Sequence, residues 1–237
     1  MTERAKSPDY VLLDLDRTLL NTEAVMLSYV KLIGRYDANL SNRLYWAWRQ
    51  AEDMNESFDA RAYLDEEVMM ERSRQDAVDQ FDQAFATASH DDEDFLNNGA
   101  AELLQGLEQR QIPHGILTYG SPTWQGLKLS VSGLGDLPHL VTQQRQKGRV
   151  ITSWAAANGE IKLPTKLTKR YRLIGNRTLT SVILVDDRLE ALVGLPAAVD
   201  GYWYTDKESK PEVCIASEAG KSQIGIINHL QQVLDIV

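Results

Sequence analysis

A short apolar run that ends in two closely spaced acids constrains the fold more than any other feature of the sequence. The run VLL leads into Asp14, and Asp16 follows two residues later. The run VILV leads in the same way into Asp186 and Asp187. Such runs favour buried strands, and ligands in open α/β sheets bind at the carboxyl ends of the strands. The repetition therefore predicts a functional site, although a single acid there is equally typical of a solvated turn or a helix N-cap.

Apolar runs alternate with helical patterns along most of the chain, which predicts an α/β fold with a doubly wound parallel sheet. At 237 residues the chain is long enough for one such domain with an insertion. The expected strands lie at residues 11–13, 114–118, 140–142, 182–185 and 197–204. The expected helices of this part lie at residues 99–110, 124–131, 147–154 and 223–237.

Residues 23–90 interrupt the alternation, because they read as helical throughout. Helices are expected at 24–36, from Ser41 through Trp48, from 57 onward and at 71–88. Proline is absent from residue 9 to residue 112, which suits long helices, and an ordinary crossover between parallel strands needs far fewer residues. We therefore expect a helical insertion at 23–90 within a core formed by 1–22 and 91–237. The acidic run at 91–94 is expected to be a solvated loop that caps the next helix.

The charge balance argues against two classes of partner. The chain has 25 basic and 34 acidic residues, a formal net charge of −9 and a sequence pI near 5.0, so its surface repels nucleic acid and anionic membranes. Cys214 is the one cysteine, which excludes an intrachain disulfide and favours a core or edge-strand position over a nucleophilic role. No apolar run reaches membrane-spanning length, and no secretory segment precedes the first strand. We expect a cytoplasmic protein.

Residues with reactive or charged side chains recur in a fixed order near the ends of the predicted strands. In order, they are Asp14-x-Asp16-x-Thr18, Thr118, Lys147 and Asp186-Asp187. This order resembles the haloacid dehalogenase-like (HAD) hydrolase superfamily. The resemblance covers most of the chain; its first and last motifs are fairly specific as a pair, while the threonine and lysine motifs gain weight from their order. It implies a Rossmann-like α/β core with an inserted helical cap.

The resemblance also implies a role for each residue. Asp14 would attack phosphorus and form an aspartyl-phosphate, which splits one difficult step into two. Asp16 would serve as general acid and base. A carboxylate at this second position marks the phosphoryl-transfer members of the superfamily and is absent from its dehalogenases. Thr118 would donate a hydrogen bond to the transferring phosphoryl oxygen, helped by backbone N–H groups of the turn at 119–121.

The acids also fit a magnesium ion. Hard divalent cations prefer oxygen ligands, and Mg²⁺ usually takes few carboxylates besides water and substrate phosphate. Asp14, Asp186 and the backbone carbonyl of Asp16 match this need. Asp187 would bind the ion directly, through water or not at all.

A cation is needed to offset the clustered acids and the phosphoryl charge, and several lysines compete for that place. They are Lys128, Lys147, Lys162 and Lys166. We expect Lys147, because it follows a short strand and leads a helix. Lys166 lies 20 residues before Asp186, a spacing also seen in the family. Arg17 either binds the substrate's phosphate or pairs with a neighbouring acid.

Together these features favour a magnesium-dependent phosphohydrolase that acts on a small phosphorylated metabolite. One alternative is a metal-independent haloacid dehalogenase, which Asp16 and Asp186 argue against. Others are a non-catalytic phospho-acceptor module of the receiver-domain type, disfavoured by the helical insertion, and a degenerate HAD-like protein that binds without turnover. The sequence predicts no particular oligomeric state.

Overall fold

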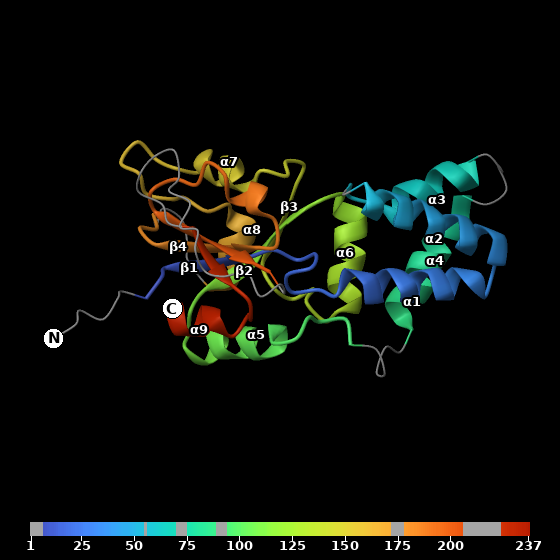
Figure 1. Ribbon diagram of the computed structural model, residues 1–237, viewed down its shortest axis with the longest axis horizontal. Coiled ribbons are helices and arrows are strands. Elements are labelled where there is room, and N and C mark those ends of the chain that lie inside the picture. Colours follow the sequence, from blue (N-terminus) through green and yellow to red (C-terminus); the bar gives the residue numbers. More distant parts are fainter. Residues whose placement is uncertain (1–6, 55, 70–74, 89–93, 172–177, 206–223) are drawn as a thin grey trace. The chain divides into compact units, whose positions relative to one another are not determined.

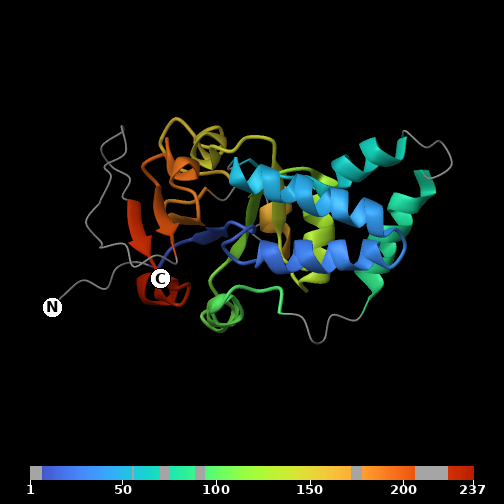
Figure 2. The ribbon, with the colours of Figure 1, turned by 45° about the vertical axis from the view of Figure 1, so that its right-hand side comes forward.

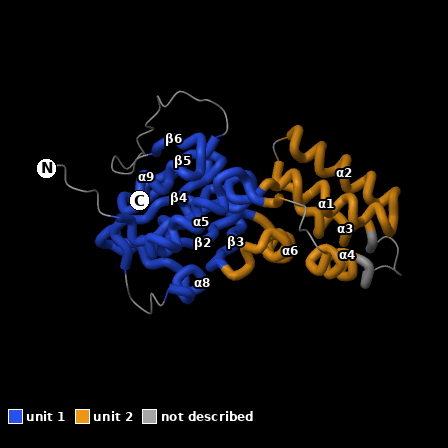
Figure 3. The backbone as a smooth tube through the Cα atoms, turned by 90° about the horizontal axis from the view of Figure 1, so that it is seen from below, with its two compact units in different colours: residues 1–20, 96–119, 137–237 blue, residues 21–95, 120–136 orange. Residues whose placement is uncertain are grey.

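The computed structural model describes residues 7–54, 56–69, 75–88, 94–171, 178–205 and 224–237. The chain forms two compact units, shown in separate colours in Figure 3. The core unit comprises Met1–Leu20, Leu96–Tyr119 and Leu137–Val237, and the helical unit comprises Asn21–Phe95 and Gly120–Asp136. The segment Gly120–Asp136 therefore belongs to the helical unit, whereas the sequence boundaries assign it to the core.

The core unit is built on a six-stranded sheet in which every neighbouring pair is parallel. The strands are β1 (Tyr10–Leu13), β2 (His114–Tyr119), β3 (His139–Thr142), β4 (Val182–Asp186), β5 (Val199–Tyr204) and β6 (Ile224–Ile227). Their order across the sheet is β3-β2-β1-β4-β5-β6. The prediction of a doubly wound parallel α/β sheet is confirmed.

The prediction of a helix across 223–237 is wrong for its first part. Residues Ile224–Ile227 form β6, which pairs with β5 through Gly201 and Ile224. The sequence IGII is a continuous apolar run, and such a run suits a strand beside a parallel neighbour. The helix of this region, α9, is confined to Gln232–Ile236.

The strand order reverses direction between β1 and β4. From β1 the chain proceeds to β2 and β3 on one side, and from β4 to β5 and β6 on the other. In doubly wound sheets the connections leave a crevice beyond the carboxyl ends of the strands at such a reversal. Leu13 pairs with Val185 in the register of β1 and β4, so the residues that follow these two strands emerge side by side (Figure 1).

Both faces of the sheet carry helices, as Figures 1 and 2 show. The helices α5 (Ala100–Gln109) and α9 lie together on one side, and α7 (Lys147–Thr152) and α8 (Thr165–Thr168) lie on the other. Tyr10, Leu12 and Leu184 are fully buried in a cluster with apolar residues of α7 and α8. Burial of each such side chain contributes about 1.5–3 kcal/mol to folding, which explains why these strands are continuously apolar.

The helical unit consists of α1 (Thr22–Gly34), α2 (Ala38–Asp53), α3 (Ala60–Met69), α4 (Gln75–Thr87) and α6 (Pro122–Val131). The prediction that Ser41 caps the second helix is wrong. Asp37 is the N-cap, and its side chain accepts hydrogen bonds from the backbone N–H groups of Asn39 and Leu40. Ser41 lies inside the helix, where its hydroxyl donates to the carbonyl oxygen of Val30.

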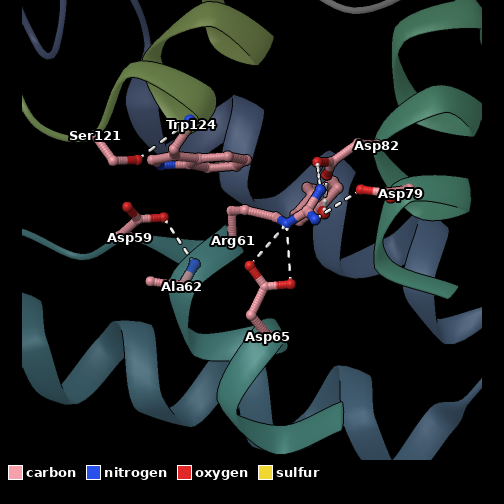
Figure 4. A network of polar contacts seen from close by, with 9 residues as sticks. Asp59, Arg61, Ala62, Asp65, Asp79, Asp82, Ser121 and Trp124 are labelled. Atoms are coloured by element: carbon pink, nitrogen blue, oxygen red, sulfur yellow. Dashed lines mark hydrogen bonds and ion pairs between the residues drawn. The ribbon is translucent and has the colours of Figure 1, made fainter. Parts of the chain in front are cut away.

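A charged network joins three helices of this unit (Figure 4). The guanidinium of Arg61 in α3 donates to Asp65 one turn later, and to Asp79 and Asp82 of α4 at 2.7 and 2.5 Å. The hydroxyl of Tyr29 in α1 donates to Asp82 at 2.6 Å. Because the Arg61 side chain is only 18% exposed, its pairing with these acids is less screened than that of a surface ion pair.

Some predictions fall outside the described residues. They concern Cys214, the first three acids of the run at 91–94, and the opening of the helix expected at 71–88. Within the part of the chain that is described, no helix is long and apolar enough to cross a membrane.

Candidate functional site

Two acids mark the carboxyl ends of the central strands β1 and β4. Asp14 directly follows β1, and its backbone N–H donates to the carbonyl oxygen of Val185 at 2.9 Å. Asp186 is the last residue of β4. The two residues are 4% and 1% exposed. Two carboxyls removed from water at adjacent strand ends require compensation by a cation or by protons.

Lys147 provides that cation within the core unit. It is the first residue of α7 and is 3% exposed. Its Nζ atom donates to Asp186 Oδ2 at 2.6 Å and also to Asp14 Oδ1. Lys166 lies in α8 and is exposed. The structure thus places Lys147 between the two acids.

The glycine after Lys147 explains how α7 reaches this position. A Cβ atom at Gly148 would collide with the backbone carbonyl of Val193 and would lie 3.1 Å from the backbone nitrogen of Leu195. Only glycine permits so close an approach between the start of α7 and this loop. Gly148 therefore helps to fix the depth at which Lys147 enters the site, a role that the sequence pattern did not indicate.

Three carboxylates in the core unit could hold a metal ion together. Asp14, Asp186 and Asp187 each offer an oxygen, and these oxygens lie within 4.8 Å of one another. Among the described residues, no other group of three or more possible metal-ligating side chains lies so close together. A set of carboxylate oxygens fits a hard cation such as Mg²⁺, which needs further ligands from water or substrate. The carboxylate of Asp16 does not belong to the set.

Burial and mutual repulsion dominate the protonation of these acids. Burial raises the pKa of Asp14 well above its ordinary value; Lys147 opposes this effect, and the neighbouring acids add to it. Burial, followed by the charge of Asp186, raises the pKa of Asp187 to about 6. Burial would lower the pKa of Lys147, but Asp14 and Asp186 outweigh it and raise the pKa, so the amine stays charged. The single buried ammonium of Lys147 therefore lies beside more carboxyl groups than it can neutralise. A divalent cation would neutralise the remaining negative charge.

Asp16 lies at the start of a tight turn that follows β1. The turn is closed by hydrogen bonds of 2.9 Å from Arg17 N–H to the Leu20 carbonyl and from Leu20 N–H to the Leu15 carbonyl. Asp16 is half-buried, and Arg17 is exposed and has a positive φ of 61°. The turn thus sets the second acid two residues beyond the first, near but outside the three-carboxylate set.

Thr118 contributes a buried hydroxyl to this region. It lies in β2, beside β1, and is 0% exposed. Its Oγ1 atom has no hydrogen-bond partner among the described residues. A buried hydroxyl without a partner costs about 1–3 kcal/mol, and an oxygen of a bound ligand would remove that cost. The expected role of Thr118 as a phosphoryl ligand stays a prediction.

Several supporting contacts were not predicted from the sequence. The hydroxyl of Thr18 donates to Asp14 Oδ2 at 3.4 Å, and Asn97 Nδ2 donates to the Thr18 carbonyl at 2.8 Å. Asp186 Oδ1 accepts from the backbone N–H of Arg188 at 2.9 Å. The indole N–H of Trp203 donates to the Asp187 carbonyl at 2.9 Å. Thr18 belongs to the motif Asp14-x-Asp16-x-Thr18, so the sequence offered a reason to expect it at the site. The other contacts depend on tertiary structure.

Comparison with known proteins places this geometry in a structural context. No protein-family model matches the sequence, and no curated protein matches it at a significant level. The structure is similar to that of a protein from Burkholderia xenovorans LB400 classed as a haloacid dehalogenase-like hydrolase, with a TM-score of 0.58 and 17% identity over 97% of this chain and 99% of the other.

Two further solved structures resemble the chain over almost its whole length. One, from Bacillus subtilis, is assigned to the HAD hydrolases and is bound to magnesium; its TM-score is 0.51, with 15% identity over 98% of this chain and 99% of the other. The second is a dehalogenase in an intermediate complex, with a TM-score of 0.51 and 17% identity over 99% of both chains. The chain therefore has the HAD-like fold, and the resemblance found in the sequence motifs is confirmed for the fold.

Proposed function

We propose that this protein is a HAD-like hydrolase, and more specifically a magnesium-dependent phosphohydrolase that acts on a small phosphorylated metabolite. The observation that carries the proposal is the contact of buried Lys147 with both Asp14 and Asp186, where Asp187 completes a three-carboxylate set. Phosphoryl transfer requires acids, a fixed cation and a set of metal ligands, and these groups lie together at one edge of the sheet.

Asp14 is the proposed nucleophile. Its carboxylate oxygen would form a bond to phosphorus as the ester P–O bond breaks, and the leaving oxygen would take a proton from Asp16. Asp16 would then accept a proton from a water molecule as that water attacks phosphorus, which releases phosphate and restores the carboxylate of Asp14. The half-buried position of Asp16, outside the three-carboxylate set, suits this carboxyl group to proton transfer.

Lys147 and Thr118 would position and stabilise the transferring group. The ammonium of Lys147 favours the ionised form of Asp14, which is the form able to attack. The buried hydroxyl of Thr118 is suited to donate to a phosphoryl oxygen. Fixed donors of this kind need little reorganisation during the reaction, and removal of one such donor commonly costs about 3–4 kcal/mol of transition-state stabilisation.

Asp14, Asp186 and Asp187 would hold the magnesium ion, together with the backbone carbonyl of Asp16. The ion would supply a Lewis acid that neutralises phosphoryl charge. The excess of acid over Lys147 supports this assignment, and so does the magnesium bound to the Bacillus subtilis protein of the same fold. We further propose that the helical unit, whose first part is inserted between β1 and β2, serves as the cap that selects the substrate.

A metal-independent dehalogenase is the second candidate, since a dehalogenase shares the fold. Such chemistry also uses an aspartate nucleophile but has no need for a three-carboxylate set. An assay with p-nitrophenyl phosphate in Mg²⁺ and in EDTA, beside halide release from a haloacid, separates the two. We expect metal-dependent phosphate release that Asp186→Ala weakens together with magnesium affinity. Halide release in EDTA without phosphatase activity would favour the dehalogenase, and magnesium binding without turnover would favour a binding module.

A further inference from the structure

Trp203 contacts the backbone of the three-carboxylate set from a neighbouring strand. It lies in β5, which is next to β4 in the sheet (Figure 3), and its register partner in β4 is Asp186. Its indole N–H donates to the carbonyl oxygen of Asp187 at 2.9 Å. Indole has one hydrogen-bond donor and no acceptor, so this bond uses the whole polar capacity of the side chain. The bond thus joins β5 to the residue at which the chain leaves β4.

The peptide unit between Asp187 and Arg188 is held at both of its polar groups. Its carbonyl oxygen accepts from Trp203, and its N–H donates to Asp186 Oδ1 at 2.9 Å. A trans peptide unit is planar, so its C=O and N–H point in opposite directions and turn together. Trp203 therefore fixes the orientation in which this N–H faces Asp186. Rotation of the peptide would turn its carbonyl oxygen toward a carboxylate that can only accept hydrogen bonds.

This peptide N–H is one of two donors that orient the carboxylate of Asp186. Oδ1 accepts from the peptide, and Oδ2 accepts from Lys147 Nζ at 2.6 Å. A carboxylate offers about four acceptor positions, so capacity for a metal ion remains on an oriented group. The bond to Trp203 also restrains the backbone of Asp187, whose carboxylate belongs to the same set. A single indole N–H thereby bears on two of the three carboxylates.

Packing holds the indole in place. Side chains two residues apart on a strand lie on the same face, so Trp203 shares a face with Gly201. A Cβ atom at Gly201 would lie 2.8 Å from Cδ1 of Leu195, which shows how closely the loop after β4 approaches this face. Trp203 packs against the core cluster that contains Leu192 and Leu195. Its side chain is therefore fixed both by packing and by its hydrogen bond, as accurate positioning of a site requires.

We propose that Trp203 is a positioning residue for the metal site, whose indole N–H sets the magnesium affinity of Asp186 and Asp187 through the peptide unit that follows Asp187. The inference rests on the proposed function, because it takes these carboxylates to hold Mg²⁺. It goes beyond that function by assigning a role to a residue of β5 that acts through the backbone and not as a ligand. Loss of a group that orients metal ligands commonly weakens metal binding roughly 10–100-fold.

Isothermal titration calorimetry with Mg²⁺ compares wild type with Trp203→Phe. Phenylalanine keeps an aromatic ring and suits a β-strand, but it has no N–H to donate. We expect the dissociation constant for Mg²⁺ to be about tenfold higher in this variant. Replacement of the Trp203 side chain by that of benzothienylalanine is the sharper change, because sulfur takes the place of the N–H and the double ring keeps its shape. It should weaken Mg²⁺ binding to the same extent.

Trp154→Phe is the matched control. Trp154 packs against the same core cluster but lies shortly after α7, and its variant should keep the wild-type affinity. Urea unfolding separates positioning from packing. A loss of packing alone would lower the stability of Trp203→Phe equally in EDTA and in Mg²⁺. A tenfold loss of affinity makes the difference from wild type about 1.4 kcal/mol larger in saturating Mg²⁺.

Equal magnesium affinity of wild type and Trp203→Phe would overturn the proposal, as would a loss that Trp154→Phe shares. Wild-type affinity in the benzothienylalanine protein, or a stability difference that does not grow in Mg²⁺, would also overturn it.

Turnover of p-nitrophenyl phosphate is measured in parallel. Weaker Mg²⁺ binding in Trp203→Phe, when wild type shows no turnover, supports the positioning role and contradicts the hydrolase. Turnover that requires Mg²⁺, with equal affinity in both proteins, contradicts the positioning role alone. Absence of Mg²⁺ binding to wild type would contradict both.

Discussion

Lys147 Nζ lies 2.6 Å from Asp186 Oδ2, although the two residues are 39 positions apart in the sequence. The same amine contacts Asp14, which is 133 positions away. Three segments of the chain therefore meet at one ammonium group, at the reversal point of the sheet between β1 and β4. The lysine compensates buried acids in the folded protein and would meet a phosphoryl group during catalysis.

Lys147→Ala should impair catalysis far more than Lys166→Ala. Loss of the ammonium would remove about 3 kcal/mol or more of transition-state stabilisation, which is roughly two orders of magnitude in kcat. Lys166 is exposed on α8, so its removal should leave kcat near wild type. Steady-state kinetics in saturating Mg²⁺ provide the measurement. An inactive Lys166→Ala beside an active Lys147→Ala would show that the lysine has been assigned wrongly.

Gly148→Ala should damage the site through the backbone rather than through charge. The new methyl group would collide with the Val193 carbonyl, so α7 must shift and carry Lys147 with it; overpacking of this kind costs about 1–3 kcal/mol. We expect lower stability and a lower kcat. Gly126→Ala is the control, because Gly126 lies in α6 with open space around it, and alanine there should stabilise the helix by about 0.5–1 kcal/mol. A Gly148→Ala protein as active and stable as wild type would contradict the close approach.

The raised pKa of Asp187 predicts how the metal-free protein responds to pH. Between about pH 4 and pH 6 the folded protein keeps a proton on Asp187 that the unfolded chain has lost. The free energy of unfolding should therefore fall as pH rises through this window, by at most about 3 kcal/mol from this group. The Asp187→Asn side chain cannot ionise, so this variant should lose the part of the pH dependence that comes from Asp187. Urea unfolding in EDTA at several pH values measures this dependence. Identical pH profiles for wild type and variant would contradict the raised pKa of Asp187.

Arg61→Ala should destabilise the helical unit. Its removal would leave Asp65, Asp79 and Asp82 without their shared cation, and loss of charged hydrogen bonds from a partly buried network costs about 2–3 kcal/mol. Arg43→Ala is the control, because Arg43 pairs with Glu67 while its side chain is 51% exposed; it should cost no more than about 1 kcal/mol. Equal destabilisation of the two variants, measured by urea unfolding, would show that the network adds nothing beyond surface pairing.

The sequence predicted five of the strands, and the proximity of the acids at their ends, because both depend on local patterns. Apolar runs bounded by polar residues identify parallel strands, and parallel strands bring their carboxyl ends to one edge. The pattern of the two runs was therefore enough to predict that Asp14 and Asp186 lie close together. The same reasoning placed Lys147 near that edge.

Other features depend on distant contacts that no local pattern reveals. Gly148 is required by a loop some 45 residues later, and Trp203 reaches the Asp187 carbonyl from β5. Asp37 and Ser41 are both good caps by residue type, and the bond from Ser41 to the carbonyl of Val30 in α1 shows how tertiary packing decided between them. The short run at β6 forms a strand because it pairs with β5. Its few residues carry too little periodicity to distinguish a strand from a helix in the sequence.

The proposed function depends above all on Asp14 carrying the phosphoryl group during turnover. To test this directly, the protein is mixed with p-nitrophenyl phosphate and Mg²⁺, quenched in acid within the first turnover, and digested for mass spectrometry. We predict phosphate on the peptide that contains Asp14, absent in EDTA and absent in a folded but inactive Asp14→Asn protein, because an amide is a poor nucleophile. Turnover without any phosphorylated peptide, or substantial activity in Asp14→Asn, would contradict it.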